Sequence, residues 1–199
     1  MSDKLILASA STTRADMLAR VGVPVETDPP HVDEGEIKDA LLAEGAPARD
    51  IADALAELKA RTTSFRHPGA LVLGADQVLV KDGKLFSKAK DKADAAGKLA
   101  LLAGGEHRLI SAAVICRDGE PVWRALDEAR LVMRPLSGAY IEDYLDKIGD
   151  AAFWSVGCYQ LEGLGAQLFT RVEGDFFTIL GLPLLPVLDY LRRVEMLPL

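Results

Sequence analysis

The sequence has few cysteines and no long uninterrupted apolar run. Only two of its 199 residues are cysteine, Cys116 and Cys158, and no Cys-x-x-Cys pair occurs. This pattern excludes a framework of several disulfides and a zinc site built from cysteine pairs. No apolar stretch reaches the ~20 residues of a membrane-spanning helix, and the residues after Met1 lack a signal-peptide layout. We therefore expect a cytoplasmic protein with two reduced core thiols.

The sequence also lacks an excess of positive charge. It contains 23 Lys and Arg against 30 Asp and Glu, a formal net charge of −7 at pH 7. Because Lys and Arg contacts to phosphates supply most of the affinity for nucleic acids, this balance argues against a broad nucleic-acid surface. It leaves room for a small phosphorylated ligand, which needs only a local cluster of donors and a divalent ion.

The amino-acid composition is that of an ordinary globular protein. Hydrophobic residues make up 49% and charged residues 27% of the sequence, and this length suits one domain with two lobes and two small domains equally well. Strand-like segments occur at 5–8, 23–27, 106–116, 125–133 and 166–172, and helical spacing at 51–60, 91–103, 137–148 and 184–194. Hairpins mixed with helices indicate an α/β fold of the α+β, mixed-sheet type.

One apolar stretch, Leu71–Val80, is interrupted by Gly74, Asp76 and Gln77. A buried strand here gains about 1.5–3 kcal/mol for each large apolar side chain. The ionised carboxylate of Asp76 opposes that gain unless a cation, a metal or several N–H groups compensate its charge. Asp76 is therefore a candidate functional residue, and the alternative is a simple turn between two short strands.

A hydroxyl-rich loop, Ser-Ala-Ser-Thr-Thr-Arg at 9–14, follows the first expected strand and precedes a helical run that Gly22 ends. Such a unit can hold an anion, because a helix N-terminus offers free N–H groups and partial positive charge. Ser9 and Ser11 can equally be plain helix caps. Arg14 favours the anion site, since a guanidinium can bind two phosphate oxygens at once.

Two adjacent carboxylates, Asp33 and Glu34, follow a proline-containing loop and precede an expected helix. They are either first-turn acids that suit the helix dipole or oxygen ligands for Mg²⁺. Lys59 closes the expected helix at 51–60, and this position alone predicts a charge that faces solvent. His107 is expected to be a structural histidine in a turn.

With these segments in order, the chain resembles the Maf family of nucleoside triphosphate pyrophosphatases nearly from end to end. The matching segments are Leu5–Ser11, Asp33–Glu34, Lys59–Ala60, Leu73–Asp76, Ser87–Lys88, Gly105–His107, Glu162–Gly163 and Gly181–Pro183. One such match is weak, whereas a set in the same order is strong. The chain departs from the family pattern at Thr12 and Thr13, where Pro and Arg are common, and at Ala89, where Pro is common.

The resemblance implies one Maf/ITPase-like domain over residues 1–199, with two lobes around a long central mixed sheet and an active-site cleft between them. It implies hydrolysis of the α–β phosphoanhydride of a nucleoside triphosphate, with Mg²⁺ or Mn²⁺ as cofactor and monophosphate and pyrophosphate as products. A homodimer is expected, without nucleic-acid or membrane partners. The alternative from another class is a non-enzymatic regulator that binds nucleic acid or a division protein.

The resemblance also assigns roles to residues. Asp33, Glu34 and Asp76 are the expected metal ligands, Ser9, Ser11, Arg14, Lys59 and Lys88 the triphosphate-binding residues, and Gln77 and Glu162 the base-side residues. Asp76 is either the general base or a metal ligand. We favour the base, with Glu34 as the main metal ligand.

The base-side residues predict the nucleotide. A carboxylate only accepts hydrogen bonds, so Glu162 suits the two adjacent donors of guanine, whereas a pyrimidine presents a carbonyl there. Gln77 with Glu162 also resembles the family branch that acts on 7-methyl-GTP, which we place ahead of UTP or dTTP. That branch often has an aromatic residue at the position of Thr13; Trp154 and Tyr159 are candidate replacements, with packing as their alternative role.

Overall fold

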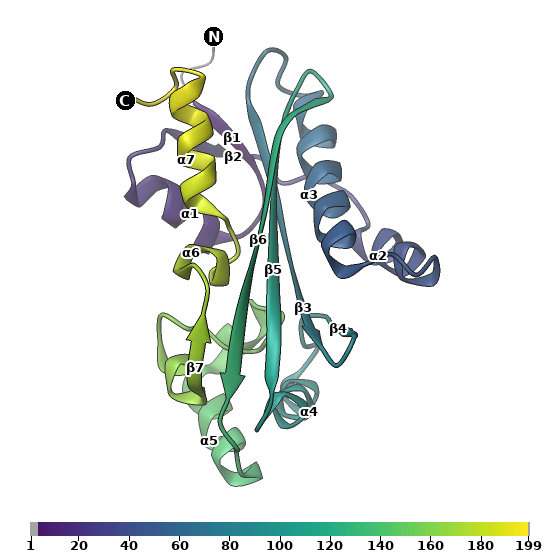
Figure 1. The fold of residues 1–199 in the computed structure, drawn as a ribbon, viewed down its shortest axis with the longest axis vertical. Coiled ribbons are helices and arrows are strands. Elements are labelled where there is room, and N and C mark those ends of the chain that lie inside the picture. Colours follow the sequence, from purple (N-terminus) through teal and green to yellow (C-terminus); the bar gives the residue numbers. More distant parts are fainter. Residues whose placement is uncertain (1–3, 199) are drawn as a thin grey trace. The chain divides into compact units, whose positions relative to one another are not determined.

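The computed structural model describes residues 4–198 and has a mixed α/β architecture (Figure 1). Its strands are β1 (Leu5–Ala8), β2 (Val25–Thr27), β3 (Val72–Lys81), β4 (Lys84–Phe86), β5 (Glu106–Arg117), β6 (Glu120–Met133) and β7 (Phe169–Glu173). They form a sheet in the order β2-β1-β3-β5-β6-β7, and β4 pairs with β3. β1 is parallel to β2 and β3, whereas β4 and β7 are antiparallel to their neighbours. The expected mixed sheet is confirmed.

Helices flank these strands. They are α1 (Thr12–Arg20), α2 (Glu34–Ala43), α3 (Ala48–Ser64), α4 (Lys92–Leu102), α5 (Gly138–Ile148), α6 (Phe176–Ile179) and α7 (Leu184–Arg193), with 3₁₀ turns η1 (Gly149–Phe153) and η2 (Leu164–Leu168). Side chains that accept a hydrogen bond from the first helical turn cap four of them, namely Ser11, Asp33, Asp91 and Ser137. None of the helices among residues 4–198 is long and apolar enough to cross a membrane.

The chain divides into two compact units. Unit 1 comprises Met1–Gln77, Ser111–Asp127 and Phe176–Leu199, and unit 2 comprises Val78–Ile110 and Glu128–Asp175. The single domain over residues 1–199 stays a prediction. Eight of the candidate residues lie in unit 1, namely Ser9, Ser11, Arg14, Asp33, Glu34, Lys59, Asp76 and Gln77, and the other two, Lys88 and Glu162, lie in unit 2.

The core of unit 1 follows the alternation of its strands. Leu73 and Ala75 of β3 belong to the core cluster that also contains buried residues of β1, α1 and α7, whereas Val72 belongs to a separate cluster. Because successive side chains of a strand point to opposite faces, Gly74 and Asp76 share the face of Val72. β3 is one uninterrupted strand, so the alternative of a turn within Leu71–Val80 is wrong.

A close approach to α3 explains Gly74. A Cβ atom at this position would lie 2.1 Å from the carbonyl oxygen of Ala56 and 2.6 Å from the amide nitrogen of Ala60. Only a residue without a side chain allows this contact between strand and helix backbones. Lys59, next to Ala60 on α3, is thereby brought beside Asp76, two residues beyond Gly74 on the same face of β3.

Unit 2 contains α4, α5, β4, β7 and the two 3₁₀ turns. Lys92 of α4 pairs with Asp146 and Glu142 of α5 at 2.6 and 3.1 Å. His107 lies in β5, not in a turn as expected. It is buried, and its Nε2 is 2.7 Å from the hydroxyl oxygen of Tyr159. Burial lowers the pKa of His107 to about 4, so the ring is neutral at physiological pH.

The two cysteines carry free thiols, and both are buried. Cys116 lies in the part of β5 that belongs to unit 1, and Cys158 lies in unit 2. Burial raises the pKa of each thiol to about 11. The expectation of two reduced core thiols is consistent with this placement.

Candidate active site

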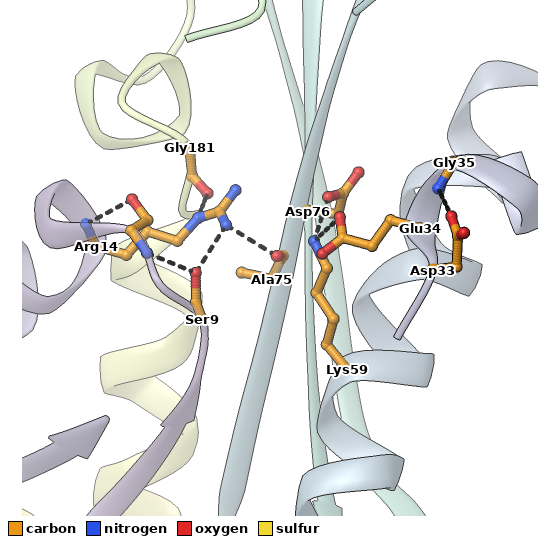
Figure 2. A network of polar contacts seen from close by, with 10 residues as sticks. Ser9, Arg14, Asp33, Glu34, Gly35, Lys59, Ala75, Asp76 and Gly181 are labelled. Atoms are coloured by element: carbon orange, nitrogen blue, oxygen red, sulfur yellow. Dashed lines mark hydrogen bonds and ion pairs between the residues drawn. The ribbon is translucent and has the colours of Figure 1, made fainter. Parts of the chain in front are cut away.

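Lys59 and two carboxylates form the centre of the candidate site. The Nζ atom of Lys59 donates a hydrogen bond to Oδ1 of Asp76 at 2.7 Å and lies 2.7 Å from Oε2 of Glu34 (Figure 2). Lys59 is only 5% exposed. The expectation of a solvent-facing lysine at a helix end is wrong, because α3 continues to Ser64 and the side chain points to Asp76.

This arrangement explains how β3 tolerates a carboxylate. Asp76 is buried, and the ammonium group of Lys59 compensates its charge. Removing one partner of a buried ion pair typically destabilises a protein by about 3–5 kcal/mol, because the other charge is left uncompensated. Oδ2 of Asp76 accepts no hydrogen bond from the residues that the structure describes. One carboxylate oxygen is therefore held while the other is available.

Arg14 is, with Lys59, the second cation among the candidate residues of unit 1. It lies in the first turn of α1, not in the preceding loop, because Ser11 caps the helix by accepting from the Arg14 amide at 3.3 Å. Its Nε donates to the Gly181 carbonyl at 2.8 Å, and its Nη1 to the Ala75 carbonyl at 2.9 Å and to Oγ of Ser9 at 3.3 Å (Figure 2). Arg14 thus ties together three segments that are distant in sequence.

One side of the Arg14 guanidinium remains available. Within residues 4–198, the hydrogen bonds of the guanidinium come from Nε and Nη1, and Nη2 donates none. Burial lowers the pKa of Arg14, while the charges of Asp76 and Glu34 raise it, and a guanidinium stays charged in proteins. A fixed cation with an unused N–H₂ group suits an anionic ligand.

Ser9 and Ser11 act as hydrogen-bond acceptors. Oγ of Ser9 accepts from the Ser11 amide at 3.2 Å, in addition to the bond from Arg14. Oγ of Ser11 is the cap of α1. Their structural roles are clear, and these contacts do not use the hydroxyl protons, so binding to phosphate stays a prediction for both.

The neighbouring acids Asp33 and Glu34 differ in role. Oδ1 of Asp33 caps α2, because it accepts hydrogen bonds from the amides of Gly35 and Glu36 at 3.0 and 3.1 Å. Glu34, the first residue of α2, points to Lys59 instead (Figure 2). The structure therefore brings Glu34 and Asp76 together and leaves Asp33 at the helix cap.

The two carboxylates fit a divalent ion whose remaining ligands are waters and phosphate oxygens of a substrate. Glu34 and Asp76 offer two hard carboxylate oxygens around one cationic atom, Nζ of Lys59. No group of three His, Cys, Asp or Glu side chains able to hold a metal occurs among residues 4–198. Mg²⁺ is usually bound by one or two carboxylates, with waters and substrate phosphates as further ligands. The pair meets that description, whereas a metal role for Asp33 stays a prediction.

Gln77 is held by backbone groups of a distant segment. Its Nε2 donates to the carbonyls of Thr178 and Ile179, both at 3.0 Å, and approaches Oγ of Ser111 at 3.1 Å. Ser111 in turn donates to the Thr178 carbonyl at 2.8 Å, and Thr178 donates to Asp127 at 2.7 Å. The amide donors of Gln77 thus fix the segment that leads to Gly181, the partner of Arg14.

Sequence reasoning missed Ser111 and Thr178. Neither belongs to a motif that carries chemistry on its own, and both are fully buried. The one available signal was the position of Thr178 three residues before the Gly181–Pro183 motif. Buried hydroxyls need a partner, but the sequence does not say which partner.

In unit 2, Lys88 lies in the loop between β4 and α4, and Glu162 lies just before η2. Both side chains are exposed. Tyr159 is buried and its hydroxyl contacts His107, so its ring is a packing element and not a face for a nucleobase. Trp154 is 62% exposed and remains a candidate for such a face.

Comparisons with known proteins agree with the motifs. A model of the family described as Maf-like protein matches residues 4–194. A nucleoside triphosphate pyrophosphatase of Roseobacter denitrificans is 52% identical over 198 residues, with full coverage of both chains. One of Sphingopyxis alaskensis is 50% identical over 195 residues, covering 98% of each chain.

A solved structure is also similar. The crystal structure of a nucleoside-triphosphatase, or dITP/XTP pyrophosphatase, from Mycobacterium abscessus matches with a TM-score of 0.41 and 20% sequence identity, covering 67% of this chain and 75% of that one. The family assignment rests on the first two comparisons. With its matched model, its relatives of similar length and its motifs in order, this chain belongs to the Maf family.

Proposed function

We propose that the chain is a nucleoside triphosphate pyrophosphatase, a hydrolase that acts on the anhydride between the α and β phosphates. The observation that carries this proposal is the cluster of Lys59, Asp76 and Glu34 in unit 1, with Arg14 in the same unit. Phosphoryl transfer requires neutralisation of phosphate charge and a positioned water. Two cations and two carboxylates meet these needs, and the relatives, which are named nucleoside triphosphate pyrophosphatases, support the same activity.

Mg²⁺ or Mn²⁺ is the proposed cofactor, with Glu34 as its main ligand and Asp76 beside it as the proposed base. When bound, the ion neutralises negative charge on the phosphates. Both carboxylates already lie beside the ammonium group of Lys59, so the site accommodates positive charge. With part of the carboxylate charge compensated in this way, the ammonium group of Lys59 would bind phosphate oxygens.

The reaction is assigned to groups of this chain as follows. Arg14, Lys59 and Lys88 bind the phosphate oxygens, with Nη2 of Arg14 as an unused donor. Oδ2 of Asp76 accepts a proton from the water that attacks the α phosphorus. The bond between that phosphorus and the bridging oxygen breaks, so pyrophosphate leaves and the nucleoside monophosphate remains.

For the base, we propose that Glu162 provides most of the discrimination. The amide donors of Gln77 are used within the protein, so only its carbonyl oxygen is left for a ligand. A carboxylate at Glu162 favours a guanine-like base, which offers two adjacent donors. The cationic 7-methylguanine of 7-methyl-GTP suits this acidic residue and the exposed ring of Trp154.

A pyrophosphate-release assay over 7-methyl-GTP, GTP, UTP and dTTP, with and without Mn²⁺ or Mg²⁺, tests the proposal. We expect metal-dependent release that is fastest with 7-methyl-GTP. Glu162→Gln should narrow the gap between 7-methyl-GTP and UTP, because an amide offers both a donor and an acceptor. Faster hydrolysis of UTP or dTTP by the unmodified protein contradicts the base assignment.

The same assay separates the other candidate roles. No release with any nucleotide and either metal contradicts the enzymatic proposal and favours the regulator that binds nucleic acid or a division protein. A homodimer and a cytoplasmic location are proposed from family membership. Size-exclusion chromatography with light scattering measures the first.

A further inference from the structure

The loop that carries Lys88, here called the Lys88 loop (residues 87–91), has its backbone held by side chains of unit 2. Nζ of Lys98 donates a hydrogen bond to the Lys88 carbonyl at 3.0 Å. Oδ2 of Asp94 accepts one from the Lys90 amide at 2.9 Å. Both residues are on α4, one turn apart, and an ion pair of 2.8 Å joins them. Two consecutive peptide segments of the loop are thus attached to one helix face.

A third contact lies between these two. The amide of Ala89 hydrogen-bonds to the sulfur of Cys158, an interaction that lowers the thiol pKa while burial raises it. Ala89 is buried, whereas Lys88 and Lys90 on either side of it are exposed. The backbone of the loop is therefore fixed while the side chain of Lys88 extends to the surface.

The cation that holds the loop is well suited to this task. The side chain of Lys98 is 16% exposed, compared with 47% for Lys92 on the same helix. A hydrogen bond from an ammonium group to a carbonyl is stronger than a neutral one. Asp94 compensates the charge of Lys98 and is itself anchored to the start of α4, because its amide donates to Asp91 at 2.8 Å.

We propose that Lys98 and Asp94 are positioning residues that hold the Lys88 loop, and through it the ammonium group of Lys88, for the phosphates of the substrate. The inference rests on the phosphate-binding role of Lys88 in the proposed function. Lys98 acts through the Lys88 carbonyl and needs no contact with the substrate. A lysine on a fixed backbone loses less conformational freedom on binding than one on a mobile loop.

A purely electrostatic role predicts a different outcome. If Lys98 acted only as a nearby positive charge, removing the negative charge of Asp94 would strengthen phosphate binding. If the pair holds the loop, Asp94→Ala weakens binding, because it removes the acceptor of the Lys90 amide and the partner of Lys98. The sign of the Asp94→Ala effect therefore separates positioning from charge.

The experiment measures the dissociation constant of inorganic tripolyphosphate by calorimetry, together with kcat and KM for the nucleotide that the full-length protein hydrolyses best. Lys98→Met and Asp94→Ala should each weaken tripolyphosphate binding and raise KM by roughly 10-fold. Lys98→Arg, which keeps a charged donor, should restore most of the affinity. The unfolding temperatures of these variants should stay within a few degrees of the unmodified protein, since i,i+4 ion pairs on a helix contribute little to stability.

Lys92→Met is the matched control, because it removes the same charge from the same helix but only breaks pairs with α5. It should leave tripolyphosphate binding unchanged. Equal weakening by Lys92→Met, or tighter binding in Asp94→Ala, overturns the positioning role in favour of a charge effect.

Lys88→Met distinguishes this inference from the proposed function. If Lys88→Met weakens tripolyphosphate binding while Lys98→Met does not, the positioning role is wrong and the proposed role of Lys88 stands. If Lys88→Met binds tripolyphosphate normally, the proposed role of Lys88 fails and the positioning role fails with it.

Discussion

The two units present their candidate charges in opposite ways. In unit 1, Lys59 and Asp76 are buried and paired with each other through their side chains. In unit 2, the side chain of Lys88 is exposed, and the contacts from Lys98 and Asp94 go to the backbone of its loop. Changes at the first site should therefore affect stability and activity together, whereas changes at the second should affect binding with little effect on stability.

The largest effect is expected at Asp76 in unit 1. Asp76→Asn preserves the shape of the side chain but removes its charge and its capacity to take a proton. We expect kcat to fall by at least about 100-fold, while nucleotide binding is largely retained. Steady-state pyrophosphate release and calorimetric titration measure the two quantities. Turnover near that of the unmodified protein would contradict the assignment of Asp76 as the base.

The next largest effect is expected at Gly74, where β3 packs closely against α3. Gly74→Ala forces a Cβ into backbone atoms of α3, the nearest at 2.1 Å, so we expect a loss of about 3 kcal/mol or more in unfolding free energy. Gly97→Ala in α4 of unit 2 is the control, because no atom lies within 4 Å of its added Cβ. It should stabilise by about 0.5–1 kcal/mol. Urea unfolding measures both, and equal effects at the two glycines would refute the packing argument.

Acidification should affect unit 2 first, through His107. Burial lowers the pKa of His107 from 6.5 to about 4. Between these two pKa values the unfolded chain binds a proton at His107 that the folded chain does not bind. The contribution of the neutral, buried ring to the unfolding free energy is therefore complete above pH 6.5 and is lost as the pH falls to 4. The loss is at most about 3 kcal/mol. His107→Gln should flatten the stability profile between pH 7 and 4.5, measured by urea unfolding, and an unchanged slope would contradict a buried neutral histidine.

The smallest effect is expected at Asp28 of unit 1, at lower pH. Hydrogen bonds from Arg66 and His67 lower the pKa of Asp28 from 3.8 to about 2. This contribution to stability is present above pH 3.8 and is lost as the pH falls to about 2. Because the Asp28 side chain is 31% exposed and solvent screens the charges, we expect only about 1 kcal/mol. The difference between Asp28→Asn and the unmodified protein should vanish below pH 2 in the same unfolding series, while a constant difference would rule out a titrating carboxylate.

Part of the fold and of the candidate site can be predicted from the sequence. The strand within Leu71–Val80 and the helix within residues 137–148 follow from local patterns of apolar residues, and both are present. The cost of a buried carboxylate at Asp76 pointed to a missing cation. These features depend on residues close to one another in the chain.

The interaction partners of Lys59 and Gln77 cannot be predicted from the sequence, because they lie in other segments of the chain. The apolar spacing stops at Ala60 and therefore predicts a helix end at Lys59, but α3 continues through the less apolar residues 61–64. The sequence predicts a base-side role for Gln77, but it does not predict that the amide donors of this residue bind carbonyls about 100 residues away. The sequence shows which group needs a partner, and the tertiary fold decides which partner it meets.

The positions of the two thiols allow local opening to be followed separately in each unit. Each unit contains one native cysteine, and a pKa of about 11 leaves only about one thiol in a thousand ionised at pH 8. Alkylation of Cys116 and Cys158 must therefore wait for local opening that exposes each sulfur to solvent. Mass spectrometry of the two labelled peptides over time would give an opening free energy for each half of the molecule without any engineered probe.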